Sequence, residues 1–121
     1  MCVAKNYSNI TRKLDKGAII KPYIKENARK ELDECIESMV DCLTHGNEEL
    51  TSEEFAVICG EINYTFSRII AKTIGQVSYT KIAIATGVLE NIKQELYRRM
   101  ASPYEDKKIV ENGDIKEYKA I

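Results

Sequence analysis

Two stretches of the sequence place carboxylates and arginines on one side of an expected helix. A guanidinium group can bind a phosphate through two hydrogen bonds, and carboxylates can hold Mg²⁺. Two such helices side by side would therefore frame a cleft for a phosphate-bearing ligand. The candidate ligand-binding residues are Glu61, Asn63, Tyr64 and Arg68 in the first stretch and Asn91, Glu95, Arg98 and Arg99 in the second.

The same polar residues also fit a purely structural network. Glu61, Tyr64 and Arg68 share one side of a helix, and Glu95 and Arg99 have the i, i+4 spacing of an ion pair. Such a pair fixes the register of neighbouring helices whether or not a ligand exists. We favour this structural interpretation, and we assign no catalytic residue.

The alternative is a nucleotide- or Mg²⁺-dependent enzyme, of the all-α pyrophosphohydrolase kind that combines Glu-x-x-Glu on one helix with Glu-x-x-Asp on the next. Glu31 and Glu34 match the first half, and so do Glu34 and Glu37. The core period places Leu32 and Ile36 inward, which turns these carboxylates toward solvent. No Glu-x-x-Asp follows on the second or third expected helix, and metal catalysis needs both sets to converge.

Zinc is a further candidate, because Cys42 and His45 lie at i, i+3, with Cys35 and Cys59 on neighbouring turns or helices. The spacing lacks a CxxC knuckle, however, and Cys35 and Cys59 lie on apolar stripes, where cysteine behaves as a small hydrophobe. We therefore expect reduced thiols, no metal and no cofactor.

Three long amphipathic helices are expected to position these residues. Each has apolar residues at steps of three and four, and each has end signals of its own. The first runs from Asn27 to Thr44, before Gly46. The second begins at Ser52, where Thr51 and Glu54 form a capping box, and ends near Gly75. The third runs from about Tyr79 to Ala101, with Ser78 as a possible cap and Pro103 as its stop.

A short fourth helix is expected after the third. Ser102 reads as its N-cap, Pro103 as its first residue and Glu105 as the glutamate that closes a capping box. Asn112 and Gly113 would end it near Glu111, and a β-hairpin turned at these two residues is the alternative. The sequence thus predicts an all-α bundle of three long helices and a short fourth, with an irregular arm (residues 1–21), a helical domain (22–114) and a tail (115–121).

The charge balance and the lack of long apolar runs argue against nucleic-acid and membrane partners. Eighteen Lys and Arg against nineteen Asp and Glu leave a formal charge of −1, which offers no electrostatic footprint for nucleic acid or an anionic membrane. No apolar run approaches the roughly 20 residues that span a bilayer, and the first residues lack the apolar stretch of a signal peptide. We predict a cytoplasmic protein that binds neither membrane nor nucleic acid.

Several short strings together resemble a family of small uncharacterised proteins of bacteria and their tailed phages. The resemblance covers Pro22 to about Asp114, and it implies a helical fold and a cytoplasmic setting but no activity. The strings are Pro22-Tyr23-Ile24, Gly60-Glu61-Ile62-Asn63-Tyr64, Glu90 to Lys93, Glu95 to Arg99, Pro103-Tyr104-Glu105-Asp106 and Glu111-Asn112-Gly113-Asp114.

Broad apolar stripes on three helices favour self-association. Gly60 and Gly87 lie in helix interiors, where each costs roughly 1 kcal/mol relative to alanine, so something is expected to approach closely there. Either two helices of one chain cross at the glycines, or a second copy packs on them. The leading hypothesis is a non-catalytic binding or accessory module of phage or mobile-element type that acts as a homodimer, with another protein as a second candidate partner.

Overall fold

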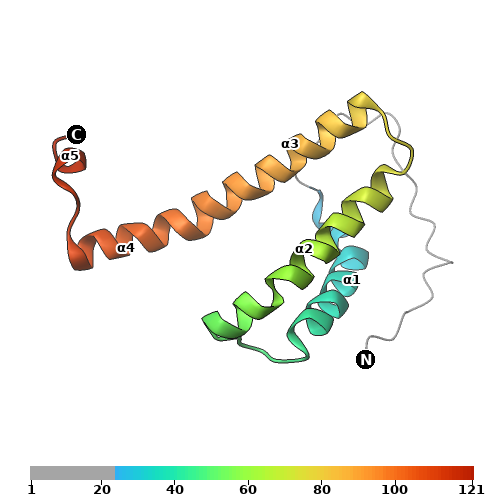
Figure 1. Ribbon diagram of the computed structural model, residues 1–121, viewed down its shortest axis with the longest axis horizontal. Coiled ribbons are helices and arrows are strands. Elements are labelled where there is room, and N and C mark those ends of the chain that lie inside the picture. Colours follow the sequence, from blue (N-terminus) through green and yellow to red (C-terminus); the bar gives the residue numbers. More distant parts are fainter. Residues whose placement is uncertain (1–23) are drawn as a thin grey trace. The chain divides into compact units, whose positions relative to one another are not determined.

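The computed structural model describes residues 24–121, and every regular element in that range is helical (Figure 1). This confirms the predicted all-α class, with three long helices and a shorter fourth. The predicted arm, residues 1–21, lies outside the described residues. The elements are α1 (Glu26–Thr44), α2 (Ser52–Ile74), α3 (Tyr79–Leu96), the π-helical turn η1 (Tyr97–Ala101), α4 (Ser102–Asn112) and α5 (Lys116–Lys119).

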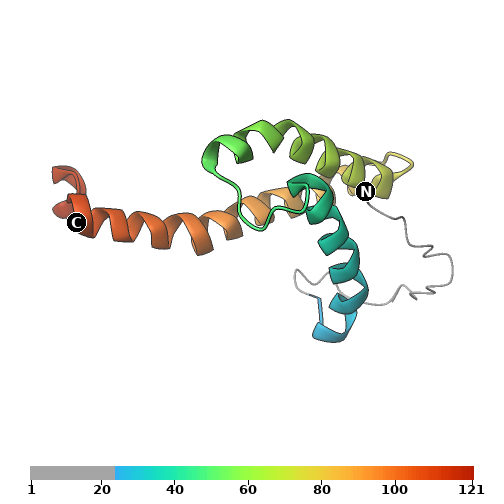
Figure 2. The ribbon, with the colours of Figure 1, turned by 90° about the horizontal axis from the view of Figure 1, so that it is seen from below.

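The chain divides into two compact units, one extending to Lys72 and the other from Thr73 to Ile121. The first holds α1 and nearly all of α2. The two helices lie close together in Figure 1, whereas in Figure 2 α1 runs across the direction of α2. The second holds α3, η1, α4 and α5, of which the first three form one unbroken helical stretch. The single turn α5 lies in the predicted tail, residues 115–121.

The ends of α1 and α2 follow the predicted signals. At the end of α1, His45 and Gly46 adopt left-handed φ angles of 53° and 76°, and the amide of Gly46 donates to the carbonyl of Asp41. At the start of α2, the amide of Glu54 donates to the Thr51 hydroxyl at 3.2 Å, and the Thr51 amide donates to the Glu54 carboxylate at 3.4 Å. The capping box is therefore confirmed, and it satisfies two amides that the helix itself leaves unpaired.

The turn between α2 and α3 is held by Gly75, Ser78 and Lys81. Gly75 ends α2 with a φ of 59°, and the Ser78 hydroxyl caps α3 by accepting from the Lys81 amide at 3.2 Å, as predicted. The Lys81 ammonium donates to the carbonyls of Ile74 and Gln76 at 2.9 and 3.0 Å. A cation thus satisfies carbonyls at the end of α2, where the helix dipole favours positive charge.

The prediction that Pro103 stops the third helix and that Ser102 caps a new one is wrong. Ala101 and Ser102 both have helical backbone angles, and the helix continues into α4 through the π turn η1. The Ser102 amide donates to the carbonyl of Tyr97, five residues back. A proline lacks an amide hydrogen and its ring crowds the carbonyl four residues earlier. The wider turn of η1 relieves this conflict without breaking the helix.

The end of α4 agrees with the prediction. Gly113 has a φ of 83°, and its amide donates to the carbonyl of Ile109 at 2.8 Å. The alternative of a β-hairpin at Asn112 and Gly113 is wrong, because residues 102–112 are helical.

Burial is low throughout residues 24–121, where no side chain, apolar or polar, is fully buried. The apolar stripes predicted from the sequence form helix faces as expected, yet Ile36, Phe66 and Ile92 keep 53%, 56% and 58% of their surface exposed. None of the described helices is both long and apolar enough to cross a membrane.

Candidate functional site

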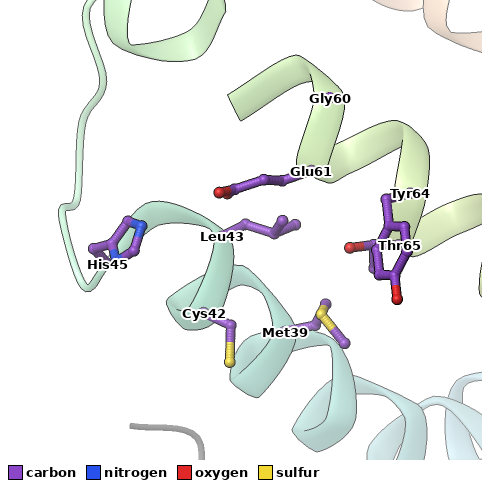
Figure 3. Close-up of a pocket in the computed structure, with 8 residues that line it drawn as sticks. All are labelled: Met39, Cys42, Leu43, His45, Gly60, Glu61, Tyr64 and Thr65. Carbon is purple, nitrogen blue, oxygen red and sulfur yellow. The ribbon is translucent and has the colours of Figure 1, made fainter. Parts of the chain in front are cut away.

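An open hollow of about 420 Å³ lies between the C-terminal half of α1 and the middle of α2, within the first unit (Figure 3). Helical spacing explains its lining, because residues three and four apart share a face of a helix. α1 contributes Met39, Cys42, Leu43 and, just past its end, His45. α2 contributes Gly60, Glu61, Tyr64 and Thr65.

Most of the surface of the hollow is apolar. Leu43 points from α1 into the gap, and the Tyr64 ring stands on the α2 side of it (Figure 3). Glu61 reaches from α2 toward the end of α1 in the same view. Its carboxylate makes no hydrogen bond or ion pair with any residue of the range 24–121. The hollow therefore combines apolar walls with one uncompensated carboxylate.

The other predicted residues of α2 interact along their own helix. The Arg68 guanidinium lies 5.9 Å from the centre of the Tyr64 ring, which is cation–π geometry. The Asn63 side-chain oxygen accepts from the Ser67 hydroxyl at 3.1 Å. Arg68 and Asn63 are therefore engaged one turn away, while Glu61 and Tyr64 line the hollow.

The predicted residues of the second unit form an ion-pair cluster at the junction of α3 and η1. Glu95 Oε2 accepts from Arg99 Nε at 2.8 Å and from Arg98 Nη2 at 3.0 Å. The Arg98 hydrogen bond, followed by that of Arg99, lowers the pKa of the Glu95 carboxyl. The predicted i, i+4 pair is confirmed, and Arg98 joins it. Asn91 lies exposed on α3.

The Glu95 carboxylate neutralises this cluster only in part, and it competes with a phosphate for the two guanidinium groups. Both guanidinium groups share one carboxylate, although Arg98 and Arg99 keep 63% and 65% of their side chains exposed. The eight predicted residues divide between the two units, four in each. A cleft that unites them stays a prediction.

Cys42 and His45 are the candidate zinc ligands near the end of α1. Both line the hollow, but in the described part of the chain no three His, Cys, Asp or Glu side chains are placed to hold a metal ion. Cys35 and Cys59 are free thiols, as expected, whereas Cys42 is disulfide-bonded, so the prediction of reduced thiols is wrong at that position.

Sequence reasoning did not identify the α1 side of the hollow. Met39 and Leu43 belong to the apolar stripe of the helix that the sequence predicts over residues 27–44, and spacing alone cannot distinguish a core residue from the wall of an open site. The available signal was Gly60, a glycine inside a helix, where the sequence predicted the close approach of another helix or of a second copy; no helix of the described chain approaches it. A Cβ built on Gly60 meets no atom within 4 Å, so the space above it is open.

The chain was compared with known proteins and families. No curated protein and no solved structure is significantly similar to it. Residues 21–115 match a family described as a domain of unknown function (DUF6899), which agrees with the extent of the resemblance seen in the sequence. Since the match covers most of the chain, this protein belongs to the DUF6899 family.

Proposed function

We propose that this protein is a non-catalytic helical binding module that works as a homodimer, paired through the apolar face of α3 and η1. The observation that carries the proposal is the exposure of that face. Leu89, Ile92, Leu96 and Met100 keep 46%, 58%, 58% and 66% of their surface accessible in the described chain. Apolar surface of this extent on one helix is typical of an interaction site.

The helix that bears this face has little support inside its own unit. Residues 79–112 form one helical stretch, roughly 50 Å long at about 1.5 Å per residue. The only other helix that lies wholly in the second unit is the four-residue α5. Most of the stability of a protein helix comes from packing of its apolar face rather than from intrinsic propensity. A partner surface is therefore needed to stabilise it.

The spacing of the apolar residues favours a helical partner. Steps of three and four alternate along the face, which is the heptad pattern of coiled coils. We call this set the α3 seam; it consists of Ile82, Ala85, Leu89, Ile92, Leu96 and Met100.

The π turn moves the last position of the α3 seam from residue 99 to residue 100. In a regular α-helix the next seam position after Leu96 would be Arg99, three residues on. The wider turn of η1 accommodates one more residue, which brings Met100 toward the seam in place of Arg99. Arg99 pairs with Glu95 at the border of the seam.

A second copy is the simplest partner, because it brings an identical seam. In a two-fold pair each seam covers the other, so a single surface serves both chains. A roughly 50 Å helix with a contact strip about 10 Å wide offers about 500 Å² per chain, or about 1,000 Å² for the pair, near the lower limit for a specific interface. The two exposed faces therefore match in length and in chemistry.

The biological setting rests on the family resemblance alone. The strings shared with small proteins of bacteria and tailed phages support an accessory protein of a phage or mobile element, located in the cytoplasm. A second protein that binds the homodimer fits the same role.

Light scattering coupled to gel filtration tests the proposal. The full chain is expected to elute at twice the chain mass, and Leu89→Glu with Ile92→Glu is expected to reduce it to one chain. Val77→Glu is the matched control, because Val77 is 70% exposed but precedes α3. A wild-type monomer that unfolds cooperatively would contradict the homodimer.

Thermal shift with nucleotides and Mg²⁺ tests the enzyme alternative on the same samples. A ligand present at 100 times its Kd would add about 2.7 kcal/mol of stability, which amounts to several degrees for a chain of this size. A non-catalytic module is expected to show no such shift. A shift that requires both nucleotide and Mg²⁺ would favour the enzyme.

A further inference from the structure

We propose that the hollow between α1 and α2 binds an organic cation, an ammonium group carried on a short apolar stem, with Glu61 as its counter-ion. This site lies in the first unit, whereas the α3 seam lies in the second. The proposal is therefore separate from homodimer formation.

Charge at the hollow favours a cation over an anion. Of the described residues that line it, Glu61 is the only carboxylate, and none is a lysine or an arginine. Glu61 has no ion pair or hydrogen bond within residues 24–121. Its carboxylate is therefore available to an ammonium group, and it would repel a phosphate or a carboxylate.

The walls of the hollow favour an apolar stem behind the charge. Met39 and Leu43 present apolar atoms from α1, and the Tyr64 ring does so from α2 (Figure 3). A volume of about 420 Å³ lies within the range of about 300–1,000 Å³ typical of small-molecule sites. A linear chain of several carbons can lie along these walls while its ammonium group reaches Glu61.

Gly60 keeps the α2 side of this space open. A Cβ on Gly60 would meet no atom within 4 Å, so packing in the first unit does not require a glycine at this position. A glycine in a helix interior lowers stability by roughly 1 kcal/mol relative to alanine. Space for a ligand next to the backbone accounts for a glycine at position 60, which helix propensity alone does not favour.

The same chemistry has two sources, a free amine and the side chain of a lysine in a protein. We would titrate the ¹⁵N-labelled full chain at pH 7 with n-hexylamine, with 1-hexanol as its neutral counterpart and with N-acetyl-lysine N-methylamide. Hexylamine is expected to shift the amides of residues 39–45 and 60–65 and to bind about fivefold more tightly than hexanol.

Variants test the role of each wall. Glu61→Gln is expected to weaken hexylamine about fivefold and to leave hexanol unchanged. Glu53→Gln, on the first turn of α2 and outside the hollow, is the matched control and should bind as the wild type does. Gly60→Leu should fill the hollow and abolish binding of both compounds, and the amide spectrum of each variant reports whether it folds.

Each outcome decides the proposal. Equal binding of hexylamine and hexanol, unchanged binding by Glu61→Gln, or shifts confined to the α3 seam would overturn it. Binding of the capped lysine as tight as that of hexylamine would support the site and assign it to a lysine side chain. Binding of hexylamine alone would support the site and assign it to a free amine.

Discussion

The Tyr97 hydroxyl donates to both carboxylate oxygens of Glu105, at 3.0 and 3.2 Å, across the π turn. Tyr97 begins η1 and Glu105 lies in the first turn of α4, eight residues later. Glu105 was expected to close a capping box with Ser102. Because the helix does not restart at Ser102, the glutamate instead joins the two sides of the irregular turn.

Loss of the Tyr97 hydroxyl is expected to change how stability depends on pH. The hydrogen bond to Glu105, and then the charge of that carboxylate, raise the pKa of Tyr97 above its usual 10.0. A raised pKa gives stability that is fully present below pH 10 and is lost as the pH rises through the folded-state value. Tyr97→Phe should lower the melting temperature by at most a few degrees at pH 7.

The difference between wild type and Tyr97→Phe should disappear above pH 10, as followed by circular dichroism on melting. Tyr104→Phe is the control, since Tyr104 contacts the Lys108 ammonium through its ring face and not through its hydroxyl. A difference that stays constant up to pH 11.5 would show that it does not come from the hydrogen bond that the Tyr97 hydroxyl donates to Glu105.

Glu95→Gln is expected to destabilise the junction of α3 and η1 at neutral pH but not at acid pH. The pKa of Glu95 is held below its usual 4.5 by Arg98 and then by Arg99. A lowered pKa gives stability that is present above pH 4.5 and lost as the pH falls through the folded-state value. The melting temperature of Glu95→Gln should lie below that of the wild type at pH 7 and equal it near pH 2.

Salt provides a second test of this ion pair, because exposed pairs are screened. The difference between the two proteins should shrink in 1 M NaCl. If Arg98→Gln instead abolished binding of a phosphate compound while leaving melting unchanged, the cluster would be a ligand site.

Thr51→Ala removes the hydroxyl that accepts from the Glu54 amide at the start of α2. Loss of such a cap costs about 1 kcal/mol, so melting should fall by several degrees. Thr51→Ser keeps the hydroxyl and should retain most of the stability. Amide hydrogen exchange should rise at Ser52 to Phe55 in the alanine variant alone, and equal exchange in both variants would contradict a capping role.

Gly87→Ala tests whether the dimer interface lies at the α3 seam or at Gly87, on the other side of the helix. Gly87 follows Ile82 by five residues, which places it on the side of α3 away from the seam, and no atom lies within 4 Å of a Cβ built there. Alanine should therefore stabilise the helix by roughly 1 kcal/mol and leave the dimer mass unchanged. Dissociation of the dimer on this substitution would instead place the interface at the glycine.

Local signals predicted the helices well because the interactions that end them are local. The Thr51 capping box, the Ser78 cap and the left-handed Gly75 and Gly113 each act within four residues, and each is confirmed. The Glu95–Arg99 pair was predictable for the same reason.

The junction at Pro103 was not predictable from the same signals. A proline after a serine resembles a helix start, and only the backbone shows that the turn widens instead of breaking. The hollow was missed for a different reason. Its walls come from α1 and α2, and the wheel of one helix does not reveal which residues of another will face it.

The extra residue in η1 has an evolutionary consequence. A π turn can be made or removed by a single-residue insertion or deletion, because the helix on either side keeps its direction while its register rotates. A family member that lacks one residue between positions 97 and 101 is expected to have a regular α-helix there, without a proline at the position of Pro103. In such a relative, the residue aligned with Met100 would follow the residue aligned with Leu96 by three positions, which keeps it in the seam of a regular α-helix. The π turn therefore lets the chain carry an extra residue without losing the last apolar contact of the seam.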